Sequence, residues 1–337
     1  MMDDRLKKAQ DLLDTMAKPP GSLGLLEKHL VKILSHWDDP REEMKPFHLI
    51  YSADNGIAAS GIAVYPPTIT TLQSRNMVAG GSTICKLCEV IGVPYQVADV
   101  GIDCEGAIGM NGKVRRGTRH ILHEPAMTDD EYQRIVDFSS QWVRKVVQEN
   151  QVNLLSFGEM GIGNTTTSAA VLCALTGEEP ANVVGLGASA ESDSHILQKK
   201  REIIQTMLEI HKNKFTNTRG ILQAVGGYDL VGLMAGMKEA AALKIPFMLD
   251  GLISVVACLS AFQEDPNVID FAIPSHLSRE PGMQVALRAM GMLPEEVVVQ
   301  GQMSLGEGSG AILYLTMLKS VHHAAKYAAR LSDFDES

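Results

Sequence analysis

The sequence predicts an α/β fold: a doubly wound, mostly parallel sheet with helices on both faces, plus a small helical subdomain. Short apolar runs typical of buried strands alternate with helical segments between residues 47 and 300. The two terminal segments have helical periodicity and lack such runs. We therefore expect N-terminal helices in 1–44, a large α/β domain in 45–308, and a C-terminal helix in 309–337 that pairs with the N-terminal ones.

Strands and helices can be assigned from apolar periodicity and from turn residues. The expected strands are 47–53, 95–100, 245–249 and 268–273, together with a run that begins at Leu154. The expected helices are 4–38 with a break at 18–22, 128–150, 165–175, 194–211, 281–290 and 309–330, with further apolar helices after 228 and 251. Residues 104–125 are glycine-rich and read as irregular.

Composition excludes several classes of protein. A formal charge of −10 over 337 residues argues against nucleic acid or an anionic membrane as the main partner. The five cysteines lack the spacing of a disulfide framework, which fits a reducing compartment. The N-terminus has no apolar signal core, and no segment reaches the length of a membrane span. We expect a cytoplasmic protein that binds neither nucleic acid nor membrane.

The main candidate site is a strand, turn and helix within residues 154–175. The turn contains Gly158, Gly161 and Gly163, and Asn164 and Thr165 open the helix. Backbone N–H groups and the positive end of the helix dipole make such a turn an anion site, and glycines allow a ligand to approach closely. Glu159, inside this turn, is unusual for a pure phosphate site, and it suggests that chemistry takes place nearby.

A second glycine-rich turn, LGEGSGA at 305–311, also contains a glutamate, Glu307. In an apolar pocket the pKa of a glutamate rises, and the residue becomes a usable base near neutrality. Each glutamate could instead be a turn residue paired with a lysine, which is the commoner case. Both turns precede apolar helices and are expected at one edge of the sheet. Neither a GxxxxGK[ST] nor an HExxH motif is present, so we expect a metal-free transfer on a phosphate-bearing small molecule.

Four weaker features have a structural interpretation beside a functional one. Cys85 and Cys88 lack a second ligand pair, so core packing is favoured over a metal site. GLGASA at 185–190 superficially matches a dinucleotide fingerprint and is weak evidence for an NAD-dependent oxidoreductase. His276 at a strand end is more often structural than catalytic. The loop 104–125 carries a basic cluster of four residues, Lys113, Arg115, Arg116 and Arg119. The first interpretation is a solvated loop or a subunit contact, and the second is a substrate anchor.

Eight stretches along the chain resemble, in the same order, the nicotinate-nucleotide–dimethylbenzimidazole phosphoribosyltransferase family. They are KPPGSLGLLE (18–27), ADNGIAASGIAVYPPTIT (53–70), VADVGID (97–103), FGEMGIGNTT (157–166), VGGYDLVGLMAG (225–236), PFMLDGLIS (246–254), PSHLSREPG (274–282) and LGEGSGA (305–311). The resemblance implies a pentosyltransferase without a cofactor. It would move the phosphoribosyl group of nicotinate mononucleotide to 5,6-dimethylbenzimidazole or a phenol, release nicotinate, and supply the lower ligand of cobamides.

The resemblance also implies roles for single residues. Glu307 corresponds to the proposed general base, and Glu159 lines the same site. The residues expected to hold phosphate and ribose are Gly161, Gly163, Asn164, Thr165, Gly187 and Lys200, the last chosen over Lys199 by alignment of KREIIQTML. The residues expected to face the aromatic base are Tyr65, Gln73 and Ser304. Family members form homodimers with sites near the subunit interface.

Three residues depart from the family pattern. Asn55 stands where many members have histidine, and Tyr65 occupies a position that is small in some members. Ser304 replaces an arginine that usually precedes LGEG, so a cation beside Glu307 is lost. Either substrate binding is rearranged, or the chain is a weakly active partner subunit in a heterodimer of the kind known in the phenol-activating branch.

Overall fold

The computed structural model describes residues 2–185 and 194–334, which are built on one six-stranded sheet. The strand order is β3-β2-β1-β4-β5-β6, and every neighbouring pair is parallel. The strands are β1 (Pro46–Ala53), β2 (Tyr95–Gly101), β3 (Met110–Asn111), β4 (Leu154–Met160), β5 (Phe247–Leu249) and β6 (Ala272–Pro274). The chain winds outward from β1 in both directions, so the predicted doubly wound sheet is confirmed, with its switch point between β1 and β4.

Thirteen α-helices are present in the described residues. They are α1 (Met2–Asp14), α2 (Leu25–Leu34), α3 (Thr68–Val78), α4 (Thr83–Ile91), α5 (Asp129–Asn150), α6 (Asn164–Thr176), α7 (Pro180–Val183), α8 (Ser194–His211), α9 (Thr218–Val225), α10 (Tyr228–Ala242), α11 (Leu252–Glu264), α12 (Gly282–Ala289) and α13 (Ser309–Tyr327). The start of α5 is the predicted capping box. Glu131 N donates to Thr128 Oγ1 at 3.2 Å, and Thr128 N donates to Glu131 Oε2 at 2.8 Å.

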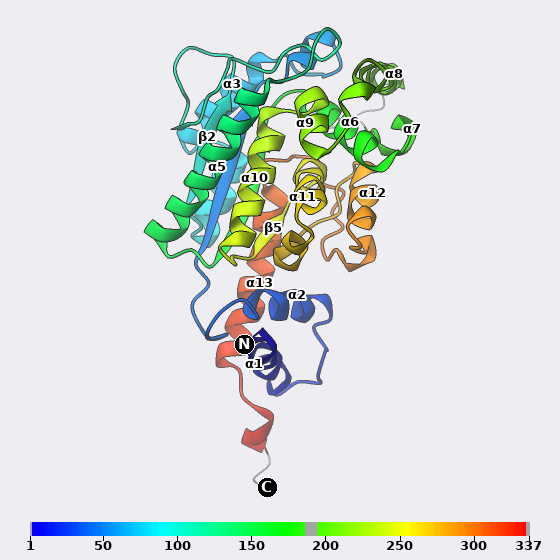
Figure 1. Ribbon diagram of the computed structural model, residues 1–337. Coiled ribbons are helices and arrows are strands. Elements are labelled where there is room, and N and C mark those ends of the chain that lie inside the picture. The colour runs from blue at the N-terminus through cyan, green and yellow to red at the C-terminus, as the bar shows by residue number, and fades with distance from the viewer. Residues whose placement is uncertain (1, 186–193, 335–337) are drawn as a thin grey trace.

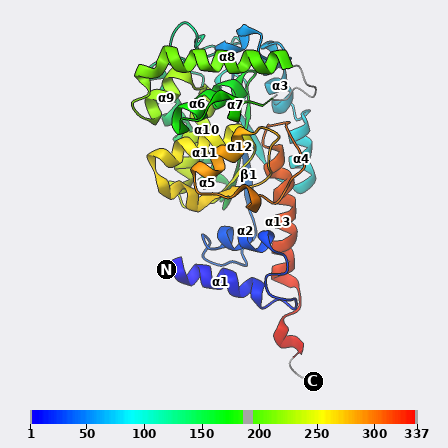
Figure 2. The same cartoon turned by 90° about the vertical axis from the view of Figure 1, so that its right-hand side faces the viewer.

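The two faces of the sheet carry two separate cores. Along β1, Leu49 and Tyr51 belong to a core that includes residues of α5, α10 and α11, whereas Ile50 belongs to one that includes α2, α4 and α13. This alternation follows from the two-residue period of a strand. Figure 2 shows α4 and α13 on one side of the sheet and α5 and α11 on the other. Both faces are therefore covered, as a parallel sheet requires.

The N-terminal helices pack against the far end of α13. In Figure 1, α1 and α2 lie beyond the amino ends of the strands, and α13 runs from the sheet down to them. Arg330 joins the termini, because its Nη1 donates to Leu12 O at 2.8 Å and its backbone forms a bridge with Met16. These contacts agree with the expected pairing of terminal helices. The division into 1–44, 45–308 and 309–337 stays a prediction.

Several sequence assignments differ from the structure, among them the helix expected to reach residue 38, which ends at Leu34. The expected strand at 268–273 is instead a 3₁₀ segment, Pro266–Phe271, followed by the short strand β6. Asp265 explains this start, because its side chain caps the segment by accepting from Asn267 N at 3.1 Å. The stretch 104–125, predicted as irregular, contains β3, whose two residues are too few to show periodicity. The last α-helix ends at Tyr327 rather than at residue 330.

All five cysteines are buried and unpaired. Cys85 and Cys88 lie in the core beside α13, as the packing interpretation predicts. Among the residues that the structure describes, no three His, Cys, Asp or Glu side chains form a group suited to a metal ion. Within the same residues, no helix combines the length and apolar character needed to cross a membrane.

Candidate active site

A cavity of about 300 Å³ lies where β4, β5 and β6 end and α13 begins. Its wall includes the ends of three strands, at Glu159, Asp250 and His276. It brings together most of the residues that the sequence predicts for a site: Tyr65, Gln73, Glu159, Gly161, Asn164, Thr165, Ser304 and Glu307. A concave site at the carboxyl ends of parallel strands is where α/β proteins bind their ligands.

The turn before α13 is held tightly against β4 and β1. His48 on β1 is fully buried. Its Nδ1 accepts a hydrogen bond from the hydroxyl of Ser156, and its Nε2 donates one to the main-chain oxygen of Glu307. Both hydrogen bonds are 2.9 Å long. Burial lowers the pKa of His48 to about 4, so the ring is neutral and can do both. A Cβ on Gly158 would overlap Glu307 O, and one on Gly308 would overlap the His48 ring. Only glycine fits at these two positions.

Glu307 occupies a left-handed backbone conformation, with φ of 63°. Its Oε1 accepts from Gln73 Nε2 at 2.7 Å, whereas its Oε2 is buried and has no partner among the described residues. Burial raises the pKa of Glu307, and the Gln73 hydrogen bond acts in the opposite direction. A buried carboxylate with one unpartnered oxygen in a cavity is suited to accept a proton from a ligand.

Glu159 shares a hydrogen-bond donor with a second buried carboxylate. Asn164 Nδ2 donates to Glu159 Oε2 and, over 3.0 Å, to Asp229 Oδ2. Glu159 Oε1 faces the Glu307 turn and accepts from Glu307 N at 3.4 Å. Burial, followed by the nearby Asp229 charge, raises the pKa of Glu159 to about 8, and burial raises the pKa of Asp229 to about 6. These two carboxyls therefore titrate as a coupled pair near neutrality.

The N-terminus of α13 is capped by Asp250 from the end of β5. The carboxylate of Asp250 accepts from the main-chain nitrogens of Gly308, Gly310 and Ala311 at 3.2, 2.8 and 3.2 Å. A negative charge at this end of a helix is favourable because the backbone N–H groups there lack helical partners. His276 lies beside it, with Nδ1 3.6 Å from Asp250 Oδ1, and also lines the cavity, so its structural interpretation stays a prediction.

The predicted anion turn connects β4 to α6. Gly163 is the N-cap of α6 with φ of 93°, and its Cβ would lie 3.2 Å from that of Ala58. Gly161, Asn164 and Thr165 line the cavity, whereas Gly163 does not. The positive end of α6 is therefore directed at the same cavity as Glu159 and Glu307.

The two lysines at the start of α8 differ in exposure. Lys200 is 5% exposed and lies near Glu280, whose charge acts on it and which lines the cavity. Lys199 is exposed and donates to Gly61 O at 3.4 Å. Lys200 is therefore the buried one of the two, but it is not among the residues that line the cavity, and its role in phosphate binding stays a prediction. The predicted phosphate residue Gly187 and most of the GLGASA match lie outside the described residues.

The outer part of the cavity is largely apolar. Tyr65 is 52% exposed at its rim, and Ile69 and Gln73 line it from α3. Ser304 and Leu305 line it from the segment before α13. An exposed aromatic ring beside an apolar wall is suited to stack on a flat ligand.

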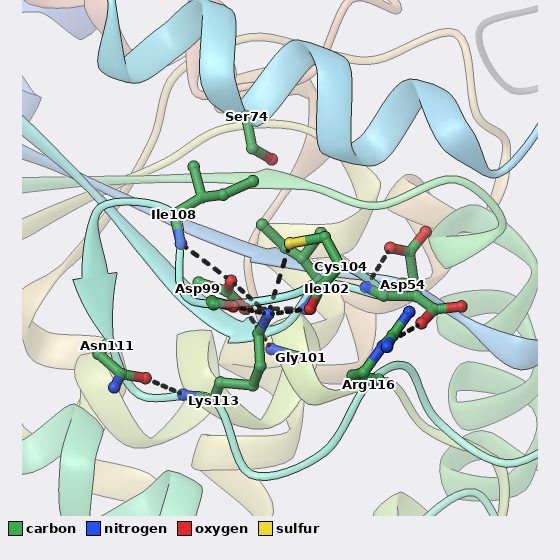
Figure 3. Close-up of polar contacts among 12 residues, drawn as sticks. Asp54, Ser74, Asp99, Gly101, Ile102, Cys104, Ile108, Asn111, Lys113 and Arg116 are labelled. Carbon is green, nitrogen blue, oxygen red and sulfur yellow. Dashed lines mark hydrogen bonds and ion pairs between the residues drawn. The ribbon is translucent and has the colours of Figure 1, made fainter.

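The basic cluster lies away from this cavity. Lys113 is largely buried, and Figure 3 shows its ammonium directed at Asp99 and the main chain of Cys104, 3.1 and 3.0 Å away. Asp99 also accepts from Ile102 N and Ile108 N, so it fastens the loop after β2. The expectation of a solvated Lys113 is therefore wrong. Arg116 pairs with Asp103 at 2.8 Å on the surface.

Sequence reasoning missed three buried residues that shape the site: His48, Asp229 and Asp250. Asp250 follows a predicted strand directly, which is a usable signal because strand carboxyl ends face the crevice. Asp229 follows Gly226-Gly227 at a helix start, a weaker signal. His48 lies within a strand, and nothing in its neighbourhood distinguishes it from a core residue.

Comparison with known proteins shows the family to which the chain is similar. A family model described as a phosphoribosyltransferase matches residues 2–337. The nicotinate-nucleotide–dimethylbenzimidazole phosphoribosyltransferase of Clostridium perfringens is 37% identical over 320 residues, covering 94% of this chain and 87% of that protein. The protein of the same name from Escherichia coli K12 is 34% identical over 319 residues, with the same coverage.

A solved structure extends the agreement to the fold. The crystal structure of CobT from Thermus thermophilus superposes with a TM-score of 0.89 at 29% identity, covering 99% of both chains. Sequence and fold therefore match over nearly the whole length. The chain belongs to the nicotinate-nucleotide–dimethylbenzimidazole phosphoribosyltransferase family.

Proposed function

We propose that this chain transfers the phosphoribosyl group of nicotinate mononucleotide to an aromatic base, 5,6-dimethylbenzimidazole or a related compound. Nicotinate would be released, and the α-riboside 5′-phosphate would enter cobamide synthesis. The observation that carries the proposal is that Glu307, a buried carboxylate whose Oε2 has no partner among the described residues, lines the same cavity as the N-terminal turn of α6. A proton acceptor and an anion-binding turn in one cavity are what this reaction needs.

Glu307 is proposed as the general base. Nicotinate mononucleotide carries a pyridinium, which leaves as a neutral ring, so no acid is required to expel it. The remaining proton is that of the incoming base, and Oε2 of Glu307 can accept it as the new bond to C1′ forms. The raised pKa of Glu307 increases its basicity. Gln73 and the backbone contact from His48 hold it in place.

The glycine turn is proposed to bind the phosphate and ribose. Gly161, Gly163, Asn164 and Thr165 surround the N-terminus of α6, and its dipole favours a negatively charged group. Lys200 is proposed to supply a compensating positive charge from α8, and Gly187 is proposed to complete this part of the site. Glu159 supports the ribose side of the cavity.

The apolar wall is proposed to hold the aromatic base. Tyr65, Gln73 and Ser304 line the same cavity and are proposed to face the base, as the family resemblance implies. The exposed Tyr65 ring can stack on a benzimidazole or a phenol.

We further propose that the chain functions in the cytoplasm as a dimer. Five buried, unpaired cysteines fit a reducing compartment. The dimer rests on the resemblance to family members that form homodimers. A heterodimeric partner subunit of low intrinsic activity is the second candidate, and Ser304 in the place of the usual arginine favours it.

Incubation with nicotinate mononucleotide and a panel of benzimidazoles and phenols tests the proposal, with products identified by mass. Glu307→Gln should lower nicotinate release by about 10²–10⁴-fold, as loss of a general base does, while nucleotide binding measured by calorimetry persists. Near-normal turnover of this variant would exclude Glu307 as the base. Glu105→Gln, at an exposed position away from the cavity, is the matched control and should behave as the unmodified chain.

The same assay separates the two candidates. A partner subunit would have little activity alone and would gain it on addition of a homologous subunit. Full activity of the purified chain as a homodimer would exclude that candidate.

A further inference from the structure

Asp229 is a fully buried carboxylate at the start of α10 for which the reaction described above has no role. It does not line the cavity, but it lies directly behind a residue that does. The amide of Asn164 connects the two, since its Nδ2 donates to both Glu159 Oε2 and Asp229 Oδ2. One amide group therefore holds a deep carboxyl and a cavity-lining carboxyl at fixed positions.

Tight backbone packing fixes Asp229. A Cβ on Gly161 would lie 2.8 Å from Asp229 Oδ2 and 3.0 Å from Asn55 Nδ2, and a Cβ on Gly227 would overlap Asp229 Oδ1. Leu230 N donates to Asp229 Oδ1 at 3.0 Å. A carboxylate enclosed in this way cannot turn toward solvent, so its charge is felt by its neighbours.

The groups that face Glu159 come from four elements besides its own strand. They are Asp229 on α10, Asp250 at the end of β5, Asn164 on α6, and the main chain of Glu307 before α13. His48 on β1 is close to the same turn and is neutral. Asp229 is faced by Asn164 and Asn55. None of these groups is a cation, so the two carboxyls must hold a proton between them to limit repulsion.

The surroundings of the two carboxyls indicate where that proton resides. Asp229 lies in the first turn of α10, at the positive end of the helix, and accepts from Leu230 N at 3.0 Å, and both contacts favour its charged form. Besides the shared Asn164 amide, Glu159 accepts, among the described residues, only from Glu307 N, at 3.4 Å, so we assign the proton to Glu159, whose pKa is raised by burial and by the Asp229 charge. The negative charge of the pair is thus on Asp229, behind the cavity wall, and the neutral carboxyl is that of Glu159, in the wall.

This arrangement matters for an anionic ligand. Four acidic side chains line the cavity, namely Glu159, Asp250, Glu280 and Glu307, and the lining within the described residues includes no lysine or arginine. A nucleotide phosphate would be repelled by each ionised carboxylate. A protonated Glu159 removes one such charge and can donate a hydrogen bond instead.

We propose that Asp229 is a positioning residue whose buried carboxylate keeps Glu159 protonated, so that Glu159 offers a hydrogen-bond donor to the anionic nucleotide in the cavity. The inference rests on the proposed function for the identity of that nucleotide. Asp229 itself touches no ligand and acts through Glu159.

Asp229→Asn tests this role. Loss of the buried charge lets Glu159 ionise at lower pH, and the negative charge then moves into the cavity wall. At about pH 7 the KM for nicotinate mononucleotide should rise about tenfold, with a smaller change in kcat, and it should recover at lower pH as Glu159 regains its proton. A KM with the same pH profile as that of the unmodified chain would overturn the proposal.

Asp229→Asn in a Glu159→Gln background distinguishes an effect that acts through Glu159 from a general effect on the fold. Glutamine is permanently neutral and cannot respond to Asp229, so Asp229→Asn should change KM less than about twofold there. An equal effect in both backgrounds would mean that Asp229 acts on the fold alone, and the proposal would fail.

Infrared spectroscopy of the unliganded chain tests this inference without an activity assay, so its failure can be distinguished from failure of the proposed function. In the unliganded chain, the infrared band of a protonated carboxyl should persist at about pH 7, disappear in Glu159→Gln, and titrate at lower pH in Asp229→Asn. Absence of that band in the unmodified chain would overturn the role of Asp229. Absence of nicotinate release with the band intact would instead overturn the proposed reaction.

Discussion

His48 Nε2 donates to the main-chain oxygen of Glu307 over 2.9 Å and so joins strand β1 to the turn that carries the proposed base. The two residues are far apart in sequence. Gly158 of β4 packs against both groups of the hydrogen bond, since a Cβ there would lie 2.3 Å from Glu307 O and 2.9 Å from His48 Nε2. A side-chain carboxylate can act as a base only when its backbone is fixed, and here that backbone is held from the sheet.

Gly158→Ala should disrupt this junction. The added Cβ would overlap Glu307 O, and neither β4 nor the turn can move without breaking buried hydrogen bonds. We expect a loss of about 1–3 kcal/mol in the free energy of unfolding and a fall in kcat for nicotinate release. Gly301→Ala is the control, since its Cβ would come no closer than 3.4 Å to any neighbour. Equal denaturation midpoints for the two variants in urea would contradict the prediction.

Gln73 should tune the pH dependence of the reaction. Its Nε2 donates to Glu307 Oε1 at 2.7 Å and lowers the pKa of Glu307 against the effect of burial. Gln73→Met removes this donor, so the pKa of Glu307 rises further. A base must be deprotonated to act, and the acidic limb of the kcat/KM profile should therefore move to higher pH. A limb that stays in place, or moves to lower pH, would show that Glu307 is not the group that titrates there.

His48 should also make stability depend on pH. Burial lowers its pKa from the ordinary value of 6.5 to about 4, so between these values the unfolded chain binds a proton that the folded chain does not. The free energy of unfolding is therefore fully retained above about pH 6.5 and falls toward pH 4, by about 3 kcal/mol for this group. His48→Gln should flatten that slope, as measured by urea unfolding at several pH values. The exposed His323→Gln should leave the slope unchanged.

The fold was predictable because its signals are local. The apolar runs at β1, β2 and β4 and the capping box at Thr128 each depend on a few neighbouring residues. The glycine turns at Glu159 and Glu307 were visible for the same reason. The coupling of Glu159 to Asp229 was not, because the amide of Asn164 contacts both the preceding strand and Asp229, which is 65 residues away on α10. Burial of Lys113 was missed likewise, since its partner Asp99 lies in strand β2, fourteen residues earlier in the chain.

Ser304→Arg should change the electrostatics of Glu307 in a definite direction. Ser304 and Glu307 line the same cavity, at a position where the resemblance implies that arginine is usual. A guanidinium near the carboxylate favours its charged form, so the pKa of Glu307 should fall and the acidic limb of the kcat/KM profile should move to lower pH. Ser304→Gln, similar in polarity and without charge, is the control and should not move it. If the chain is a weakly active partner subunit because the cation is missing, Ser304→Arg should also raise nicotinate release by the purified chain. A fall in release, with the limb unmoved, would mean that this cavity has adapted to serine and that the added side chain obstructs the aromatic base.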